Sequence, residues 1–418
     1  MRARSRCEPW CASHTAAWSE KCQQDGWVAG GWCTGCDECA ASAADAPRSH
    51  RPATEWPAYR HSDTCTNGTD WRLADETIAA RWRVCSRWMA TWPGMPYRTD
   101  AMACEGAKAT GLGLGYAAAR YLGLCSERPA IYPDCAIGLP ASSMATTHSV
   151  LDALGGGTLH IVGDSLSSQH FYATACYLAA PLLHASGQPR ARTLVSRTPE
   201  LPCHRGLHSR CVRLGIDALR EDAPDGRGHT LPGMLCYTNV DRLMGVQWSE
   251  AAVLEELMAY GLLRPKELVL LNVGVHVKPD EAGRQLELVL KWLHGLKRTE
   301  RPRLMWRETS PQHFRTSDGS YSRPEPNASF GTCQDDALDV YNSVTLPRLR
   351  RSRLNVSVLP VWQLTQQAAK QHGGAIIHAD PRPRSLDCTH FCQQGGVLDA
   401  WSALLLSRVL RAPPGGLT

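Results

Sequence analysis

Three polar residues in this chain have the types and the order that nucleophilic acyl transfer needs: Ser165, Asp387 and His390. A serine hydroxyl becomes a nucleophile when an imidazole removes its proton, and a carboxylate fixes the tautomer of that imidazole. Because only two residues separate Asp387 from His390, the carboxylate can turn back to the ring. The pattern predicts a Ser-His-Asp triad that meets at one rim of the fold. A surface turn at 387–390 is the plain structural alternative.

The predicted nucleophile follows an apolar, β-prone run, Leu159–Val162, and precedes a segment with apolar residues at helical spacing. Gly163 permits a sharp turn, and the N–H groups of the first helical turn point toward the hydroxyl, where they stabilise negative charge. The tripeptide of Gly163, Asp164 and Ser165 also occurs simply as a helix cap, so it does not establish a nucleophile alone.

A second strand end supplies a candidate oxyanion donor. Residues 267–273 (ELVLLNV) read as a buried strand, with Asn272 at its end and Gly274 just beyond. The Asn272 amide can donate to an oxyanion, and Gly274 lets substrate approach the backbone. We therefore predict an oxyanion hole made by the Ser165 backbone N–H and the Asn272 amide. The alternative is that Asn272 is only a turn residue.

These residues need a scaffold, and the rhythm of the chain after residue 155 provides one. Apolar strand-like runs are expected at 159–162, 268–273, 304–306 and 354–359. Helical patterns are expected at 250–263, 280–296, 336–349, 361–370 and 397–410. This alternation predicts an α/β fold, a parallel sheet with helices on both faces, whose sites form at the C-terminal ends of the strands.

The chain before residue 155 has a different character. Residues 1–39 form a Cys/Trp-rich module that we expect to be held by three disulfides, because so short a segment buries little apolar surface. Its cysteines are Cys7, Cys11, Cys22, Cys33, Cys36 and Cys39. A zinc knuckle is the alternative, formed by His14, Cys33, Cys36 and Cys39. Residues 40–57 read as a linker, 58–154 as a disulfide-braced, loop-rich lead-in, and 155–412 as the catalytic domain.

Composition indicates the compartment and excludes some partners. The 418 residues are 43% hydrophobic, enough for a sizeable core, and the net charge of +5 is too small to indicate nucleic acid. Eighteen cysteines and three glycosylation sequons, at Asn67, Asn327 and Asn355, indicate the secretory pathway, either the Golgi lumen or outside the cell. We therefore expect a signal peptide or membrane anchor ahead of this chain. A cytosolic protein with free thiols is the alternative.

Beyond the triad, several motifs match one family. They are GDS at 163–165, SPQHF at 310–314, GTC at 331–333 and DCTHFCQQGGVLDAWSALLL at 387–406. With these the sequence resembles the SGNH or GDSL hydrolase superfamily, and within it the trichome-birefringence-like and PC-esterase branch, over about residues 155–412. The N-T-G-H run of that branch is here NVGVH, with His276 displaced by one position, so we assign His276 no role. The G-R-P-D and W-R-W-Q-P runs of the branch have no convincing counterpart.

The resemblance implies an SGNH-type, flavodoxin-like three-layer fold and an O-acyltransferase, above all an O-acetyltransferase, that modifies glycan hydroxyls. An acetyl donor would be the co-substrate, a glycan the acceptor, and no metal or organic cofactor would be required. Gly163, Asp164, Gly274 and His313 are candidates for the substrate cleft, and His313 is alternatively a structural histidine.

The same triad would serve an esterase in which water replaces the sugar, and a glycan-binding protein with a relict site is a third hypothesis. Cys388 and Cys392 flank His390, and we expect them to anchor its loop through disulfides, one of them to Cys333.

Overall fold

The structure is a computed structural model of the whole chain. It describes residues 71–73, 131–133, 141–185, 208–214, 233–240, 249–314, 316, 333–335, 337–376, 385–391 and 396–411. The chain divides into two units, Met1–Ala53 and Thr54–Thr418. The predicted Cys/Trp module, the linker and most of the lead-in lie outside the described residues, so the following concerns the second unit.

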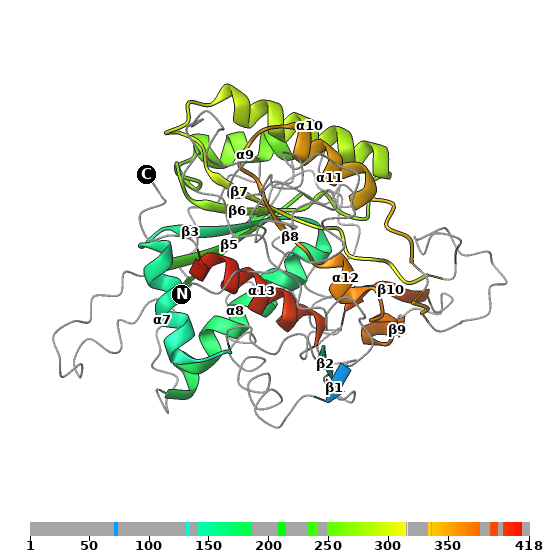
Figure 1. Cartoon of the computed structure of the whole chain (residues 1–418). Helices are drawn as coiled ribbons and strands as arrows, with labels where there is room; N and C mark the ends of the chain where they lie inside the picture. Colours follow the sequence, from blue (N-terminus) through cyan, green and yellow to red (C-terminus); the bar gives the residue numbers. More distant parts are fainter. Residues whose placement is uncertain are drawn as a thin grey trace, which may run out of the picture. The chain divides into compact units, whose positions relative to one another are not determined.

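A six-stranded sheet forms the centre of this unit (Figure 1). Its strands are β3 (Thr158–Gly163), β4 (His208–Leu214), β5 (Gly233–Asn239), β6 (Leu268–Leu271), β7 (Arg303–Arg307) and β8 (Ser357–Leu359). Their order is β4-β5-β3-β6-β7-β8, and only the pair of β4 and β5 is antiparallel. In chain order the parallel strands run 2-1-3-4-5, the flavodoxin-like arrangement, whose switch point here lies between β3 and β6.

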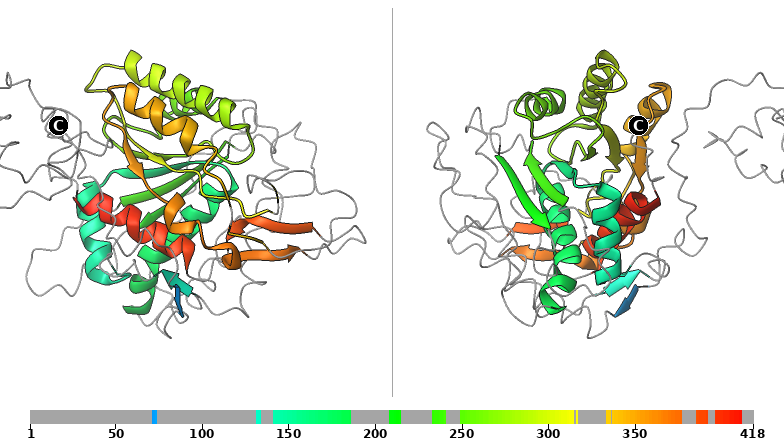
Figure 2. Two further views of the ribbon diagram at one scale, coloured as in Figure 1. Left: turned by 45° about the vertical axis from the view of Figure 1, so that its right-hand side comes forward. Right: turned by 90° about the vertical axis from the view of Figure 1, so that its left-hand side faces the viewer.

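Helices cover both faces of the sheet (Figure 2). One face carries α7 (Met144–Leu154), α8 (Ser165–Ala185) and α13 (Val397–Arg411), whose apolar side chains share one core. The other carries α9 (Glu250–Ala259), α10 (Pro279–Gly295) and α11 (Asn342–Arg351). The predicted α/β architecture with a mostly parallel sheet is confirmed.

The central helix is α8, in which every residue from Ser165 to Ala180 is buried. Its sequence is apolar or small around nearly the whole circumference, as expected of a helix enclosed on all sides. The sheet and α13 supply that enclosure. Ser165, its first residue, therefore begins a helix that is enclosed by the core.

Some boundaries differ from the sequence prediction. The helix α7 lies in the stretch expected to be a loop-rich lead-in, yet Val150 and Leu151 pack into the same core as α8. The helix expected from 336 begins only at Asn342, whose N–H donates to the Asp339 carboxylate at 3.1 Å. The helix expected at 361–370 divides into α12 (Trp362–Thr365) and the 3-10 turn η4 (Ala369–Gln371).

Two antiparallel pairs lie outside the central sheet and were not predicted. One joins β1 (Trp71–Leu73) to β2 (Ile131–Pro133), and the other joins β9 (His372–Ile376) to β10 (Ser385–Phe391). The second pair matters for function because β10 carries Asp387 and His390. No described helix is long and apolar enough to span a membrane.

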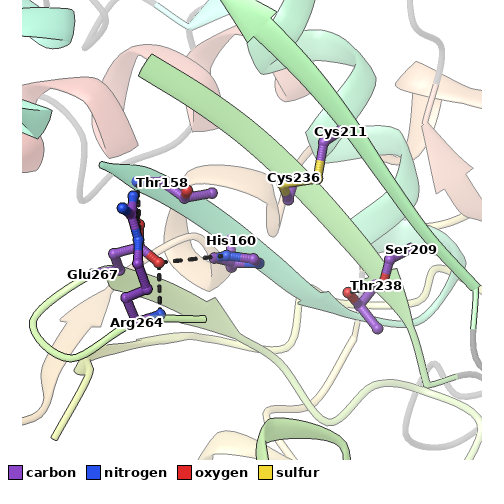
Figure 3. Close-up of a disulfide and its surroundings, with 8 residues drawn as sticks. All are labelled: Thr158, His160, Ser209, Cys211, Cys236, Thr238, Arg264 and Glu267. Carbon is purple, nitrogen blue, oxygen red and sulfur yellow. Dashed lines mark hydrogen bonds and ion pairs between the residues drawn. A yellow bond between two sulfur atoms is a disulfide. The ribbon is translucent and has the colours of Figure 1, made fainter. Parts of the chain in front are cut away.

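The N-terminal end of the sheet is fastened by a buried carboxylate (Figure 3). The Glu267 side chain accepts the Thr158 N–H at 3.0 Å and the Arg264 guanidinium at 2.8 Å. The His160 ring lies 3.9 Å from the same carboxylate, and burial lowers its pKa to about 4, so the ring is neutral at neutral pH. These contacts tie the start of β3 to the start of β6 and hold in register the two strands that carry the site at their other ends.

The same view shows a disulfide between Cys211 and Cys236, which face each other on β4 and β5. It crosslinks the antiparallel edge pair of the sheet. Disulfides were expected from the cysteine count, and this pair forms one.

Candidate active site

The structure brings Ser165 and His390 together. The Ser165 hydroxyl oxygen lies 2.7 Å from His390 Nε2, although the residues are 225 positions apart in sequence. Ser165 begins α8 directly after β3, and His390 lies near the end of β10. The contact that the sequence predicts is therefore present, with a geometry that allows the hydroxyl proton to pass to the ring.

The third predicted member of the triad, Asp387, is placed only in part. Its backbone pairs with Gly374 in the hairpin of β9 and β10. Its side chain lies outside the described part of the structure. The orientation of the His390 ring by Asp387 stays a prediction.

The Asp164 carboxylate builds the turn that presents Ser165. Its Oδ1 accepts the N–H groups of Leu166 at 3.0 Å and Ser167 at 3.2 Å, which caps α8. Its Oδ2 accepts the Val275 N–H at 3.2 Å, which ties the helix to the loop after β6. One buried side chain thus fixes the start of α8 and the neighbouring loop together.

Gly163 and Gly274 are required because that turn is so closely packed. A Cβ on Gly274 would lie 1.3 Å from Asp164 Oδ2, and one on Gly163 would lie 2.2 Å from the Ser167 hydroxyl. The sequence prediction that Gly163, Asp164 and Gly274 line a substrate cleft is corrected here. All three are buried, and the group that approaches the Gly274 backbone is the protein's own carboxylate.

The Asn272 side chain has a different position from the one expected. Its amide nitrogen donates to the Arg307 carbonyl at 3.0 Å and to the Thr309 hydroxyl at 3.1 Å, while its oxygen accepts from the Arg307 guanidinium at 2.9 Å. The orientation is unambiguous, because a guanidinium only donates and a carbonyl only accepts. Both amide protons are engaged inside the fold. As placed, Asn272 has no N–H left for an oxyanion, which departs from the sequence prediction.

Arg307, which donates to the Asn272 oxygen, is a fully buried cation that sequence reasoning did not identify. Its guanidinium also donates to the Ser167 hydroxyl at 3.1 Å and the Leu166 carbonyl at 3.3 Å, and it lies over the Trp401 ring. Burial lowers the pKa of Arg307 to about 10, so it remains charged at neutral pH. A positive charge beneath the first turn of α8 reinforces the positive end of that helix.

The strand segment that carries His390 is held from several sides. Cys388 is crosslinked to Cys333, as expected from sequence, and the Thr389 hydroxyl accepts from the Gln312 amide at 2.8 Å. Gln169, one helical turn after Ser165, donates to the Phe391 carbonyl at 2.8 Å and accepts its N–H at 3.2 Å. The helix that begins at Ser165 therefore binds the backbone of the residue next to His390.

His313 is buried, and it does not line a cleft. Its Nδ1 contacts the His372 ring, and its Nε2 contacts the Gln366 carbonyl at 3.0 Å. His372 in turn lies 3.0 Å from the His390 carbonyl. Burial lowers the pKa of His313, so the ring is neutral. The structure thus favours the structural alternative for His313, as a support for the strand of His390.

A second imidazole reaches the serine. His276 Nε2 lies 3.3 Å from the Ser165 hydroxyl oxygen, and the residue is partly exposed. The sequence prediction gave His276 no role, because it stands one position beyond the histidine of the motif it resembles. The topology contains the missing signal: His276 follows β6, next to β3 across the switch point, where sites form in such sheets.

A comparison with known protein families finds a match in the C-terminal part of the chain. Residues 269–408 match the PC-Esterase model, described as a GDSL/SGNH-like acyl-esterase family found in Pmr5 and Cas1p. The match runs from β6 into α13 and includes His276 and His390, while Ser165 lies before it. No curated protein matches the chain significantly. The chain therefore contains, over residues 269–408, a PC-esterase domain of the GDSL/SGNH-like acyl-esterase kind.

Proposed function

We propose that this protein is an SGNH-type O-acyltransferase that moves an acetyl group onto glycan hydroxyls through Ser165. The observation that carries the proposal is the 2.7 Å contact between the Ser165 hydroxyl and His390 Nε2 at the switch point of the sheet. The family match over residues 269–408, which include His390, supports acyl-ester chemistry.

In the first half-reaction His390 Nε2 accepts the Ser165 proton while the hydroxyl oxygen attacks the carbonyl carbon of the acetyl donor. The tetrahedral adduct collapses, the donor's leaving group takes the proton from His390, and an acetyl-serine ester remains. The Ser165 backbone N–H, at the positive end of α8, stabilises the oxyanion. Asp387 would orient the ring.

In the second half-reaction a glycan hydroxyl gives its proton to His390 and attacks the acetyl-serine carbonyl. Collapse of this adduct forms the glycan ester and returns the proton to Ser165. No metal or organic cofactor takes part in this scheme. Transfer instead of hydrolysis requires that the sugar reach the acyl-enzyme before water does.

Hydrolysis is the second candidate, because the family is described by acyl-esterase activity. The same residues would act, with water as the second nucleophile. The two functions are separated by incubating the protein with an acetyl donor, with and without an oligosaccharide acceptor. Acetate released at the same rate in both cases would identify an esterase, whereas acetylated oligosaccharide would identify a transferase.

The nucleophile itself is tested by fluorophosphonate labelling of protein secreted from eukaryotic cells. We expect labelling of the wild type, none of Ser165→Ala, and full labelling of Ser168→Ala, a matched serine in the same helical turn. Labelling that survives in Ser165→Ala would refute the proposal. If the wild-type protein binds glycan but is not labelled, the result would instead support the glycan-binding alternative.

The proposed compartment is the secretory pathway, the Golgi lumen or the cell exterior, with a membrane anchor as one means of retention. Two described disulfides, Cys211–Cys236 and Cys333–Cys388, support it, because such bonds persist in oxidising surroundings. Asn355 of the third sequon is exposed just before β8, where a glycan could be attached.

A further inference from the structure

The described site contains two imidazoles at one serine, and the proposed mechanism uses only one. We propose that His276 is a further catalytic residue: its Nε2–H donates to the Ser165 oxygen at rest and to the carbonyl oxyanion during acyl transfer. This inference rests on the proposed acyl-transfer function and adds the side-chain donor that it lacks.

The proton count at Ser165 supports this assignment. A serine hydroxyl has one proton to donate and lone pairs that accept. His390 Nε2 at 2.7 Å and His276 Nε2 at 3.3 Å both face this single hydroxyl. Only one ring can accept its proton, so the other must present an N–H to avoid opposing lone pairs. The proposed mechanism makes His390, at the shorter distance, the acceptor, which leaves His276 as the donor.

The backbone around His276 is fixed on both sides. The Val275 N–H donates to Asp164 Oδ2 at 3.2 Å, and the Tyr341 hydroxyl lies 2.9 Å from the Val277 carbonyl and 3.4 Å from the Val275 carbonyl. A donor that is held in place before the reaction stabilises developing charge without reorganisation. The ring of His276 is thus carried by a loop braced to the turn of the nucleophile and to α11.

The position of Asn272 means that another residue must supply the side-chain donor to the oxyanion. Both of its amide protons are engaged by Arg307 and Thr309, so the strand-end amide does not face the reacting carbonyl. In the tetrahedral adduct the oxyanion and the serine oxygen are bonded to the same carbon. A donor that already reaches the serine oxygen is therefore close to the oxyanion as well. His276, four residues after Asn272, supplies a donor of that kind.

The test measures steady-state hydrolysis of p-nitrophenyl acetate by the full-length protein. Removing one oxyanion donor lowers kcat by about 10² to 10³-fold in other acyl transferases. We expect that loss in His276→Ala, with KM changed by less than about twofold. His276→Gln keeps an N–H but cannot take up a proton, and we expect it to recover to within about tenfold of wild type.

A second readout needs no turnover. Nitrogen-15 NMR of the histidine rings, with resonances assigned from the His276→Gln and His390→Gln variants, reports which ring nitrogen carries the proton. We expect a protonated Nε2 on His276 and an unprotonated, hydrogen-bonded Nε2 on His390. Ser165→Ala should change both signals.

Three results would overturn the inference: wild-type kcat in His276→Ala, equal loss in the Gln and Ala variants, or an unprotonated Nε2 on His276. Failure of the proposed function looks different, because wild type and Ser165→Ala would then hydrolyse the ester equally. The NMR measurement still decides whether His276 donates in that case. Thermal unfolding of each variant separates a lost donor from a lost fold.

Discussion

Replacing Gly274 by alanine should destabilise the turn before Ser165 more than the addition of a single methyl group suggests. The new Cβ would lie 1.3 Å from Asp164 Oδ2 and 2.3 Å from Asp164 Cγ. The carboxylate would have to move by about 2 Å to reach ordinary contact distance. Such a movement breaks its bond to Val275 and disturbs those to Leu166 and Ser167.

The magnitude follows from these bonds. A hydrogen bond to a charged group contributes about 1.5 to 3 kcal/mol, and a buried N–H left without its acceptor costs a similar amount. With one bond broken and two distorted, Gly274→Ala should lower the free energy of unfolding by about 3 to 5 kcal/mol. That is a large part of the roughly 5 to 15 kcal/mol that stabilises a typical domain.

Urea unfolding under non-reducing conditions, followed by tryptophan fluorescence, measures the loss. Gly295→Ala is the matched control, because nothing lies within 4 Å of the added Cβ and the residue ends a helix. It should leave stability unchanged or raise it by up to about 1 kcal/mol. In an Asp164→Ala background the Gly274→Ala change should cost far less, because the clashing carboxylate is gone.

The reasoning would be refuted if Gly274→Ala unfolded within about 1 kcal/mol of the wild type. It would equally be refuted if the costs of the two substitutions simply added. Either result would mean that the carboxylate does not occupy the space beside Gly274.

Three further changes have defined outcomes. Gln169→Met removes both side-chain hydrogen bonds to the backbone of the strand that carries His390. We expect kcat for ester hydrolysis to fall about 10²-fold with little change in KM, because misplacement of a catalytic group costs that much. An unchanged kcat would contradict this expectation. Cys333→Ser and Cys388→Ser each remove the crosslink, and each should lower the free energy of unfolding by about 4 kcal/mol because the two cysteines are 55 residues apart. The double variant should lose no more than either single variant, and urea unfolding measures all three. Burial raises the pKa of the Glu308 carboxyl in the folded protein to about 7. Between about pH 4.5 and pH 7 this carboxyl ionises in the unfolded chain but keeps its proton in the folded protein, so the free energy of unfolding falls as the pH rises through this range. Glu308→Gln should therefore be about 1 to 3 kcal/mol more stable than wild type at pH 8 and equal to it at pH 4.

Sequence patterns were sufficient for the architecture where the elements are strongly periodic. The strands β3, β6 and β7 and the helices α9, α10 and α13 fall within a few residues of their predicted ranges. The pair β4 and β5 lacked a clear alternation, and β9 contains two glycines, so none of the three gave a strand signal.

At the site, sequence reasoning located the contact of Ser165 and His390 because each lies in a compact local motif. It misjudged Asn272 because the decisive partner, Arg307, lies on another strand, and no sequence pattern reveals which carbonyl and guanidinium will surround an amide. It passed over His276 because the residue is displaced from the motif by one position. Side-chain orientation within the fold decides both cases.

The order of the elements along the chain has a consequence for biosynthesis. Ser165 leaves the ribosome 225 residues ahead of His390, and α13, which packs against α8, follows later still. Until then His390 cannot reach the Ser165 hydroxyl, and the apolar side of α8 that α13 covers is exposed and available to chaperones. The proposed nucleophile therefore meets its proposed base only when the C-terminal strand and helix have docked.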